Sequence, residues 1–402
     1  MECEPATKNG HYYELDSLRG LAALTVMFHH FMMILPAFTL PFAANIPLAI
    51  RLIHFTPLGF IVAGRAAVIF FFVLSGFVLS LPFLKSGKKP STPAFIIKRI
   101  CRIYPAYLLA LLFAVTMNLL CYRGAVNELS NWFNSFWWQG VNWHEVVNQL
   151  FLVNSFDAQK YNPPIWSLMI EMRLSLVFPL LVFFATRFGW KANVIIGLTC
   201  NLVGWGAQFL RHRGVLQFES NYIDTLNYVL MFVVGIQLAF HREKLRWRFL
   251  QLNRPAKYLA FFLALLAYTN DCWTGQLFYS SGLHKYLQTQ FTVDLLTTVA
   301  VSGFIVMALA SGKISSILLW RPFHYLGKIS YSFYLLHIII LFTLLQLLNA
   351  LLPLPLVLAL VAALSFVFAS LSYHWVEIPF IRLGKFLAQK LNKSILSSPS
   401  IF

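Results

Sequence analysis

The chain has 402 residues, of which 59% are hydrophobic and only 11% are charged, whereas soluble domains carry about 25% charged residues. This composition excludes an ordinary soluble enzyme and predicts an all-α polytopic membrane protein. The formal net charge of +17 could indicate a nucleic-acid partner, but basic loops that set membrane topology explain it better, so we expect no nucleic acid.

Ten stretches are apolar enough to cross a bilayer as helices, which takes about 20 residues each. They cover residues 15–36, 62–84, 103–122, 164–186, 192–210, 224–240, 256–270, 291–311, 329–350 and 354–376, and the sixth and seventh are short. With a cytoplasmic N-terminus, most of the 31 Lys and Arg residues fall in cytoplasmic stretches. This distribution predicts about ten transmembrane helices with both chain termini inside.

The chain divides into a short cytoplasmic tail over 1–14, a transmembrane domain over 15–376 and a basic cytoplasmic tail over 377–402. Pro379 is expected to end the tenth helix, and residues 385–402 are expected to fray. Four tryptophans in the loop 123–163 predict that this loop lies in the membrane interface. The five cysteines are scattered and form no CxxC pair, so we expect neither a disulfide framework nor a metal site.

The first apolar stretch carries ionisable side chains within LDSLRGLAALTVMFHH, residues 15–30. Arg19 and His30 lie within about 20° of one helical face and about 16 Å apart along the axis. Ionisable groups at such depth usually face a protein interior or a wet cavity. The pair therefore predicts chemistry within the membrane, with His30 as the candidate general base. The alternative is a snorkelling arginine beside a buried, hydrogen-bonded histidine, while His29 is expected to pack against a neighbouring segment.

Arg99 and Arg102 stand at the start of the third stretch, in KRICRIYPAY. Residues three apart share a helical face, and two guanidinium groups suit phosphate oxygens. Both are therefore candidate ligands of a phosphate-bearing donor that arrives on the side where Arg19 lies. Alone, such a pair is more often a topology signal.

The fourth stretch reads IWSLMIEMRLS, with Ser167 and Glu171 on one face and Arg173 nearby. Glu171 is either half of an ion pair that holds the bundle or a carboxylate that orients and charges a catalytic histidine. The sequence leaves these two interpretations open.

The ninth stretch reads LGKISYSFYLLHIII, in which Ser330, Tyr334 and His337 form a polar stripe. Tyr334 and His337 are candidate substrate contacts, although a buried histidine there is more often a structural hydrogen-bond partner. Glu377, after the tenth stretch, is expected to pair with basic residues.

The second stretch contains the small pair Ser75-Gly76, which predicts close helix packing. Arg65 lies toward its outer end. We expect this arginine to snorkel, with a substrate contact as the alternative.

Six of these segments, in this order, resemble the acyltransferase-3 family of integral membrane acyltransferases, which O-acetylate bacterial surface sugars and some secondary metabolites. LDSLRGLAALTVMFHH is similar to that family's opening signature of an arginine, ten residues and a histidine. The other similar segments are FFFVLSGFVLS, KRICRIYPAYL, IWSLMIEMR, LGKISYSFYLLH and WVEIPF.

The resemblance implies ten transmembrane helices in a bacterial inner membrane and an acyl-CoA donor, most simply acetyl-CoA, that enters from the cytoplasm. The acceptor would be a hydroxyl of a polysaccharide, another glycan or a small molecule. The resemblance implies a catalytic role for His30 and roles in activity or donor binding for Arg19, Arg99 and Arg102. Our own interpretation adds Glu171 as a candidate partner that orients His30 or stabilises its charge. Some members carry an added hydrolase-like domain, and we expect none here. The acyl chain and the oligomeric state stay open.

Two mechanisms and two other functions remain. His30 could act as a base during direct transfer, or it could form a covalent acyl-histidine. A secondary transporter or lipid-linked sugar flippase would also place charges at mid-membrane, although such folds often contain internal repeats and the sequence has no recognisable one. The second other function is that of a non-catalytic homologue that binds acyl-CoA as a sensor.

Overall fold

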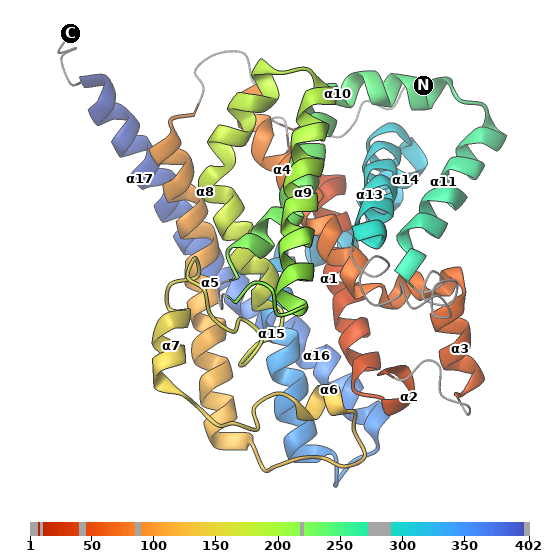
Figure 1. Cartoon of the computed structure of the whole chain (residues 1–402), viewed down its shortest axis with the longest axis vertical. Helices are drawn as coiled ribbons and strands as arrows, with labels where there is room; N and C mark the ends of the chain where they lie inside the picture. The colour runs from red at the N-terminus through yellow and green to blue at the C-terminus, as the bar shows by residue number, and fades with distance from the viewer. Residues whose placement is uncertain are drawn as a thin grey trace. The chain divides into compact units, whose positions relative to one another are not determined.

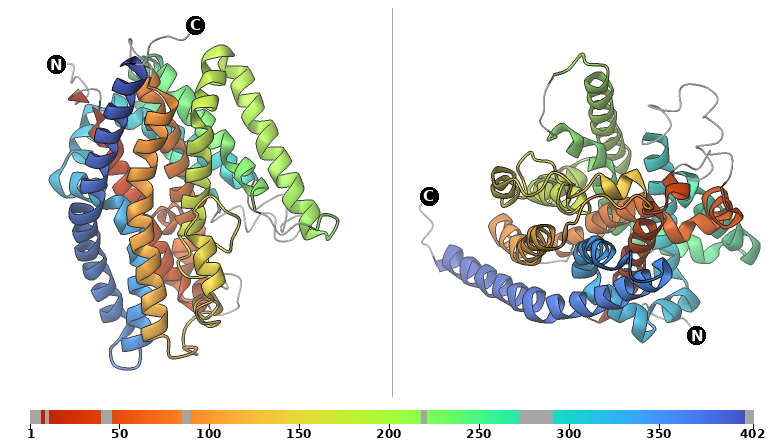
Figure 2. Two further views of the ribbon diagram at one scale, coloured as in Figure 1. Left: turned by 90° about the vertical axis from the view of Figure 1, so that its left-hand side faces the viewer. Right: turned by 90° about the horizontal axis from the view of Figure 1, so that it is seen from below.

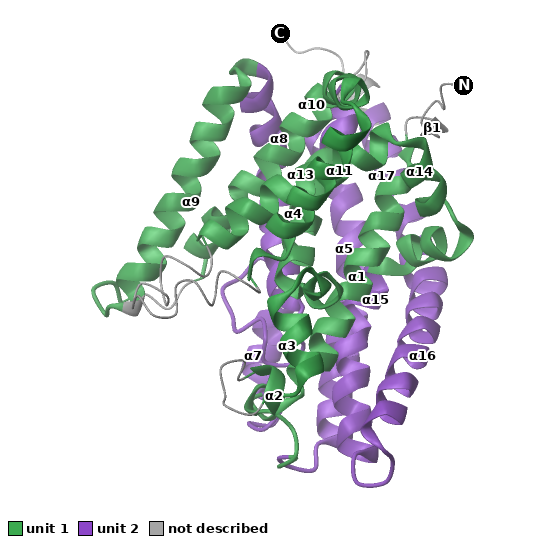
Figure 3. Ribbon diagram, turned by 90° about the vertical axis from the view of Figure 1, so that its right-hand side faces the viewer, with its two compact units in different colours: residues 1–79, 126–135, 187–330 green, residues 80–125, 136–186, 331–402 purple. Residues whose placement is uncertain are grey.

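The structure, a computed structural model, describes residues 7–8, 11–39, 46–84, 90–217, 221–271 and 291–397. It is helical apart from two antiparallel two-residue strands, β1 (Thr7–Lys8) and β2 (His11–Tyr12), in which Thr7 pairs with Tyr12. The chain forms two compact units, coloured separately in Figure 3. The first holds residues 1–79, 126–135 and 187–330, and the second holds residues 80–125, 136–186 and 331–402.

The first unit is organised by long helices that Figure 1 labels. They are α1 (Tyr13–Met33), α4 (Gly64–Leu84, as far as residue 79), α9 (Trp190–His212), α10 (Val229–Gln251), α11 (Arg254–Tyr268) and α13 (Val293–Ala310). Shorter elements join them: α2 (Pro36–Thr39), α3 (Leu48–Phe55), η1 (Pro57–Val62), α6 (Asn131–Asn134), η2 (Ile223–Tyr228) and α14 (Gly312–Leu318). Helix α13 packs against both α10 and α11, while α1 contacts η1, α13 and α14.

Helices α4 and α10 approach each other closely because each contributes a glycine. A Cβ atom on Gly76 would lie 2.3 Å from the carbonyl oxygen of Phe232, and one on Gly235 would lie 2.1 Å from that of Val73. Since both neighbours are backbone atoms, any larger residue would force the helices apart. The close packing predicted from Ser75-Gly76 is confirmed.

The second unit contains α5 (Thr92–Cys121), α7 (Trp143–Gln149), α8 (Ile165–Arg187), α15 (Arg321–Leu348, from residue 331 on), α16 (Leu354–Ser372) and α17 (Ile378–Ser397). Helix α17 packs along α5, as the dark blue and orange helices of Figure 2 show. A Cβ atom on Gly384 would lie 2.7 Å from the Cβ of Cys101, and the Ser91 hydroxyl donates to Asn392 Oδ1 at 2.6 Å. Small residues thus allow these two helices to lie in contact.

All ten predicted stretches fall largely on helices. Among the described residues, eight helical segments are long and apolar enough to span a membrane, and they lie on α4, α5, α8, α9, α10, α13, α15 and α16 with α17. Helix α1 is not among them, because Arg19 and two histidines lower its hydropathy, and neither is α11, which has 15 residues. The all-α polytopic membrane fold is confirmed, whereas the count of ten and the inside placement of both termini stay predictions.

One predicted helix boundary is wrong. Instead of ending before Pro379, α16 continues through a π-helical turn, η5 (Tyr373–Glu377), into α17, so the fraying expected from residue 385 does not occur up to Ser397. A π turn inserts one extra residue, which makes room for a proline ring that would clash in a regular α-helix. Glu377, in that turn, is buried, and its Oε1 accepts hydrogen bonds from the backbone N–H and the hydroxyl of Ser332 at 3.2 and 2.6 Å.

Candidate active site

His30 lies in the last turn of α1, where its ring stacks on Trp132 with centroids 5.5 Å apart and planes 13° apart. Trp132 belongs to α6, which is tied to the end of α1. The Ser130 hydroxyl donates to the Met33 carbonyl at 2.6 Å, and the Ser130 N–H donates to the Ile34 carbonyl at 2.9 Å. Because the stack fixes the plane of the imidazole, the ring nitrogens of His30 are held in defined directions. The sequence showed Trp132 only as part of an aromatic loop.

Arg19 lies nearer the start of the same helix, in a small charged cluster. Its Nη1 is 3.1 Å from Asp16 Oδ1, and Asp16 Oδ2 is 2.5 Å from His11 Nε2. A Cβ atom on Gly327 would lie 2.4 Å from the Asp16 carbonyl oxygen, so α15 packs tightly on this turn. The cluster gives α1 a charged end about 16 Å from His30 along the axis.

His29 packs against a neighbouring segment, as predicted. Its Nδ1 is 2.8 Å from the Val62 carbonyl oxygen, and a Cβ atom on Gly64 would lie 2.5 Å from its ring. His29 therefore fastens η1 to α1, while the adjacent His30 faces Trp132.

In the second unit, Arg99 and Glu171 form an ion pair with Nη2 and Oε1 2.6 Å apart. The Arg99 guanidinium also donates to the Ser175 hydroxyl from Nε at 3.2 Å and from Nη2 at 3.0 Å. Arg99 is 8% exposed, so the pair is largely desolvated. Of the two interpretations of Glu171, the structure contains the ion pair. Orientation of His30 by Glu171 stays a prediction, since His30 belongs to the first unit.

Arg102 lies one turn after Arg99 and differs from it in its surroundings. It is half-buried, and it makes no hydrogen bond or ion pair to another residue of the described part of the chain. The nearby Ile103 carbonyl accepts from the Tyr331 hydroxyl at 2.8 Å, which joins α15 to this turn of α5. Of the two arginines, Arg102 thus has the guanidinium that is available to a ligand.

Tyr334 and His337 are buried where α15 meets the start of α8. The Tyr334 hydroxyl is 2.7 Å from Ser167 Oγ, which donates to the Pro164 carbonyl at 3.1 Å. His337 Nδ1 is 3.0 Å from the Phe333 carbonyl. These contacts match the structural role considered for His337. Substrate contact by either residue stays a prediction.

One ion pair was missed by the sequence interpretation. Arg65 Nε and Nη2 donate to Asp294 Oδ1 and Oδ2, both at 2.9 Å, which joins α4 to α13. The expected snorkelling of Arg65 is therefore wrong, because the guanidinium has a buried carboxylate partner within the unit. The available signal was Asp294 itself, an isolated acid at the start of an apolar stretch, but its partner lies 229 residues away in the chain.

Comparison with known proteins adds an independent finding. The Acyl_transf_3 family model, described as an acyltransferase domain, matches residues 12–374. YrhL of Bacillus subtilis (strain 168), whose name describes a candidate peptidoglycan O-acetyltransferase, is 24% identical over 338 residues, which are 80% of this chain and 51% of YrhL. The peptidoglycan O-acetyltransferase OatA of Listeria monocytogenes serovar 1/2a is 25% identical over 338 residues, 80% of this chain and 52% of OatA.

A further relative, the acyltransferase MdmB of Streptomyces mycarofaciens, is 32% identical over 171 residues, 41% of this chain and 38% of MdmB. The chain thus spans about half the length of YrhL and of OatA, and its match to MdmB covers less than half of that protein. No solved structure matches the chain significantly.

Proposed function

Because this chain belongs to the acyltransferase-3 family, we propose that it is an integral membrane O-acyltransferase that transfers an acetyl group from acetyl-CoA to a hydroxyl of a surface polysaccharide or another glycan. The observation that carries the proposal is the family match over residues 12–374, which includes both Arg19 and His30. The names of two bacterial relatives make peptidoglycan a first acceptor to test. We place the protein in the bacterial inner membrane.

In the proposed reaction, His30 accepts the proton of the acceptor hydroxyl while that oxygen attacks the thioester carbonyl carbon. The carbon–sulfur bond then breaks, and the departing CoA thiolate takes the proton back from His30. Stacking on Trp132 supports this role, because a ring held in one plane needs no reorientation during proton transfer. In the competing path, a His30 nitrogen attacks the thioester first, CoA leaves, and the acceptor hydroxyl then takes the acetyl group from the histidine.

In this proposal the donor's phosphates contact Arg102, and Arg19 is a further basic group that contributes to donor binding or activity. The contrast between the two arginines supports this assignment. Arg99 is engaged with Glu171 and Ser175, whereas Arg102 has no ionic partner among the described residues. In this proposal Arg99 balances the charge of Glu171 and positions α8 beside α5.

Turnover by the purified protein in lipid vesicles tests the function. Radiolabelled acetyl-CoA and peptidoglycan fragments or other glycans are supplied, and both released CoA and acetylated acceptor are measured. Replacing His30 by Gln should lower kcat by at least about a hundredfold, the usual contribution of a general base. The matched control is His144→Gln, which alters an exposed histidine and should leave turnover unchanged.

Two results would overturn the proposal. Wild-type turnover by a folded His30→Gln protein would remove the assigned base. Glycan transport across the vesicle membrane without any acyl transfer would instead identify a transporter. Exchange of labelled CoA into acetyl-CoA without an acceptor would select the acyl-histidine path over direct transfer.

A further inference from the structure

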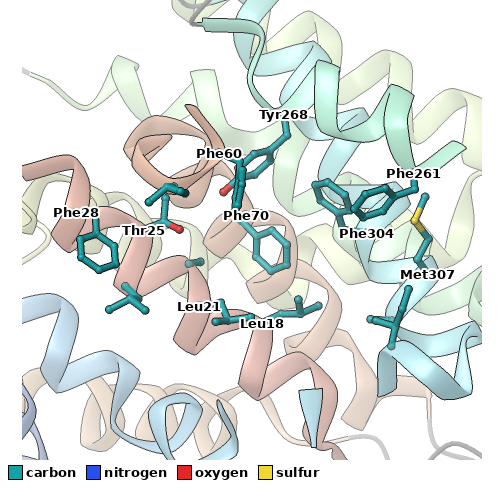
Figure 4. A pocket seen from close by; sticks show the side chains of 15 residues that line it. Leu18, Leu21, Thr25, Phe28, Phe60, Phe70, Phe261, Tyr268, Phe304 and Met307 are labelled. Carbon is teal, nitrogen blue, oxygen red and sulfur yellow. The ribbon is translucent and has the colours of Figure 1, made fainter. Parts of the chain in front are cut away.

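A second candidate ligand site, an apolar cavity of about 420 Å³, lies in the first unit (Figure 4). Its walls come from α1, η1, α4, α11, α13 and α14. The lining residues of α1 run from Leu18 to Phe28, a length of about 15 Å. Thr25 lies within this stripe, and His30 is about 140° round the helix from it. The cavity therefore opens on a different face of α1 from the one assigned to catalysis.

Two hydroxyl groups enter this otherwise apolar space. Figure 4 shows the side chains of Thr25, from α1, and Tyr268, from the end of α11, directed into it. Tyr268 is only 8% exposed, yet neither hydroxyl has a hydrogen-bond partner among the residues that the structure describes. Both side chains line the cavity, so their hydroxyl groups are open to a molecule bound in it. An oxygen acceptor on a bound molecule would satisfy both groups.

The length of α11 bears on which molecule can reach these hydroxyls. The helix has 15 residues, about 22 Å, whereas the hydrocarbon core of a bilayer is about 30 Å thick. In the predicted topology the seventh apolar stretch, which α11 covers, crosses the bilayer, and beside so short a span the bilayer thins, so that lipid polar groups lie nearer its centre. Because Tyr268 is the last residue of α11, its hydroxyl lies where such a displaced polar group would be.

We propose that this cavity binds one acyl chain of a bilayer glycerophospholipid, whose ester carbonyl oxygen accepts hydrogen bonds from Thr25 and Tyr268. The apolar lining suits a hydrocarbon chain, and the volume falls in the range of about 300–1,000 Å³ typical of ligand sites. The exposed rings of Phe60 and Phe261 form part of the cavity wall. A chain held there would fill the space between α1 and α11 and steady the helix that carries His30.

Photocrosslinking in lipid nanodiscs tests this site. The nanodiscs contain phosphatidylcholine with a small fraction that carries a diazirine in one acyl chain, and labelled peptides are identified by mass spectrometry. Label should concentrate on the lining segments of α1, α11 and α13. Thr25→Val and Tyr268→Phe each remove one hydrogen bond, so each should lower this labelling about fivefold, the effect of a typical hydrogen bond. The double variant should show both losses. Tyr258→Phe, an exposed position on α11, is the matched control.

Three results would overturn the proposal. The first is even labelling over all lipid-facing helices, and the second is equal labelling by an ether-linked analogue that lacks the ester carbonyl. The third is that unlabelled polyprenyl phosphate displaces the photoreactive lipid from the cavity more strongly than unlabelled phosphatidylcholine does. If the double variant does not fold, each single variant keeps the test available. The substitutions leave Arg19 and His30 unchanged, and the lipid site does not depend on the proposed acyl transfer. The two proposals therefore fail separately.

Discussion

Replacing Asp294 by Asn should destabilise the protein far more than changing a surface charge. Asp294 is 1% exposed at its side chain and receives two hydrogen bonds of 2.9 Å from Arg65, whose side chain is 24% exposed. Asparagine keeps the shape of the side chain but removes its charge. The guanidinium of Arg65 would then stay in the interior without a compensating anion.

The magnitude follows from this geometry. Breaking a buried ion pair by removing one partner costs about 3–5 kcal/mol. Because Arg65 is partly accessible to solvent, we expect the lower end of that range, about 3 kcal/mol, for Asp294→Asn and a similar loss for Arg65→Met. The double variant Arg65→Met with Asp294→Leu should recover most of the loss, since apolar residues often replace a buried pair without net cost.

Unfolding of the detergent-solubilised protein by SDS, followed by circular dichroism, gives the required free energies. A double-mutant cycle for Arg211 and Asp224 is the matched control, because these side chains are 31% and 21% exposed and their coupling should stay below about 1 kcal/mol. The reasoning is refuted if either single change at Arg65 or Asp294 is nearly neutral, or if the double variant loses the sum of the two single losses.

Three further predictions concern packing and the site. Gly235→Ala should lower the free energy of unfolding by about 1–3 kcal/mol, since its Cβ would meet a backbone oxygen at 2.1 Å. A Cβ on Gly206 would have nothing within 4 Å, so Gly206→Ala should be neutral or stabilising. SDS unfolding measures both variants. Trp132→Ala should lower kcat about tenfold by releasing the ring of His30, and an unchanged kcat would argue against positioning by the stack. Arg102→Gln should raise the KM for acetyl-CoA about 10- to 100-fold, but it should raise the KM less for a thioester of dephospho-CoA if the contact is to the 3′-phosphate.

The sequence predicts this fold well where local signals decide the structure. Apolar stretches locate the helices, and Asn162-Pro163-Pro164 precedes α8, which starts at Ile165. It fails where a distant partner or an irregular turn decides. Nothing near Arg65 in the chain indicates Asp294, and nothing before Pro379 indicates the π turn that accommodates its ring. The first failure arises because membrane rules take no account of tertiary contacts. The second arises because helix rules treat a proline as the end of a helix and do not consider a π turn.

The site has the same limit, which the two arginines of KRICRIYPAY illustrate. By sequence, Arg99 and Arg102 are equivalent: both are basic, three residues apart and suited to phosphate. In the structure α8 supplies Glu171 and Ser175 to Arg99, whereas Arg102 has no such partner among the described residues. Arg99 already donates from Nε and Nη2, and Glu171 balances its charge, so it offers a phosphate fewer N–H groups and less charge than Arg102 does. If both arginines matter for activity, they therefore matter in different ways: Arg102 through donor affinity, and Arg99 through the stability of the α5–α8 contact.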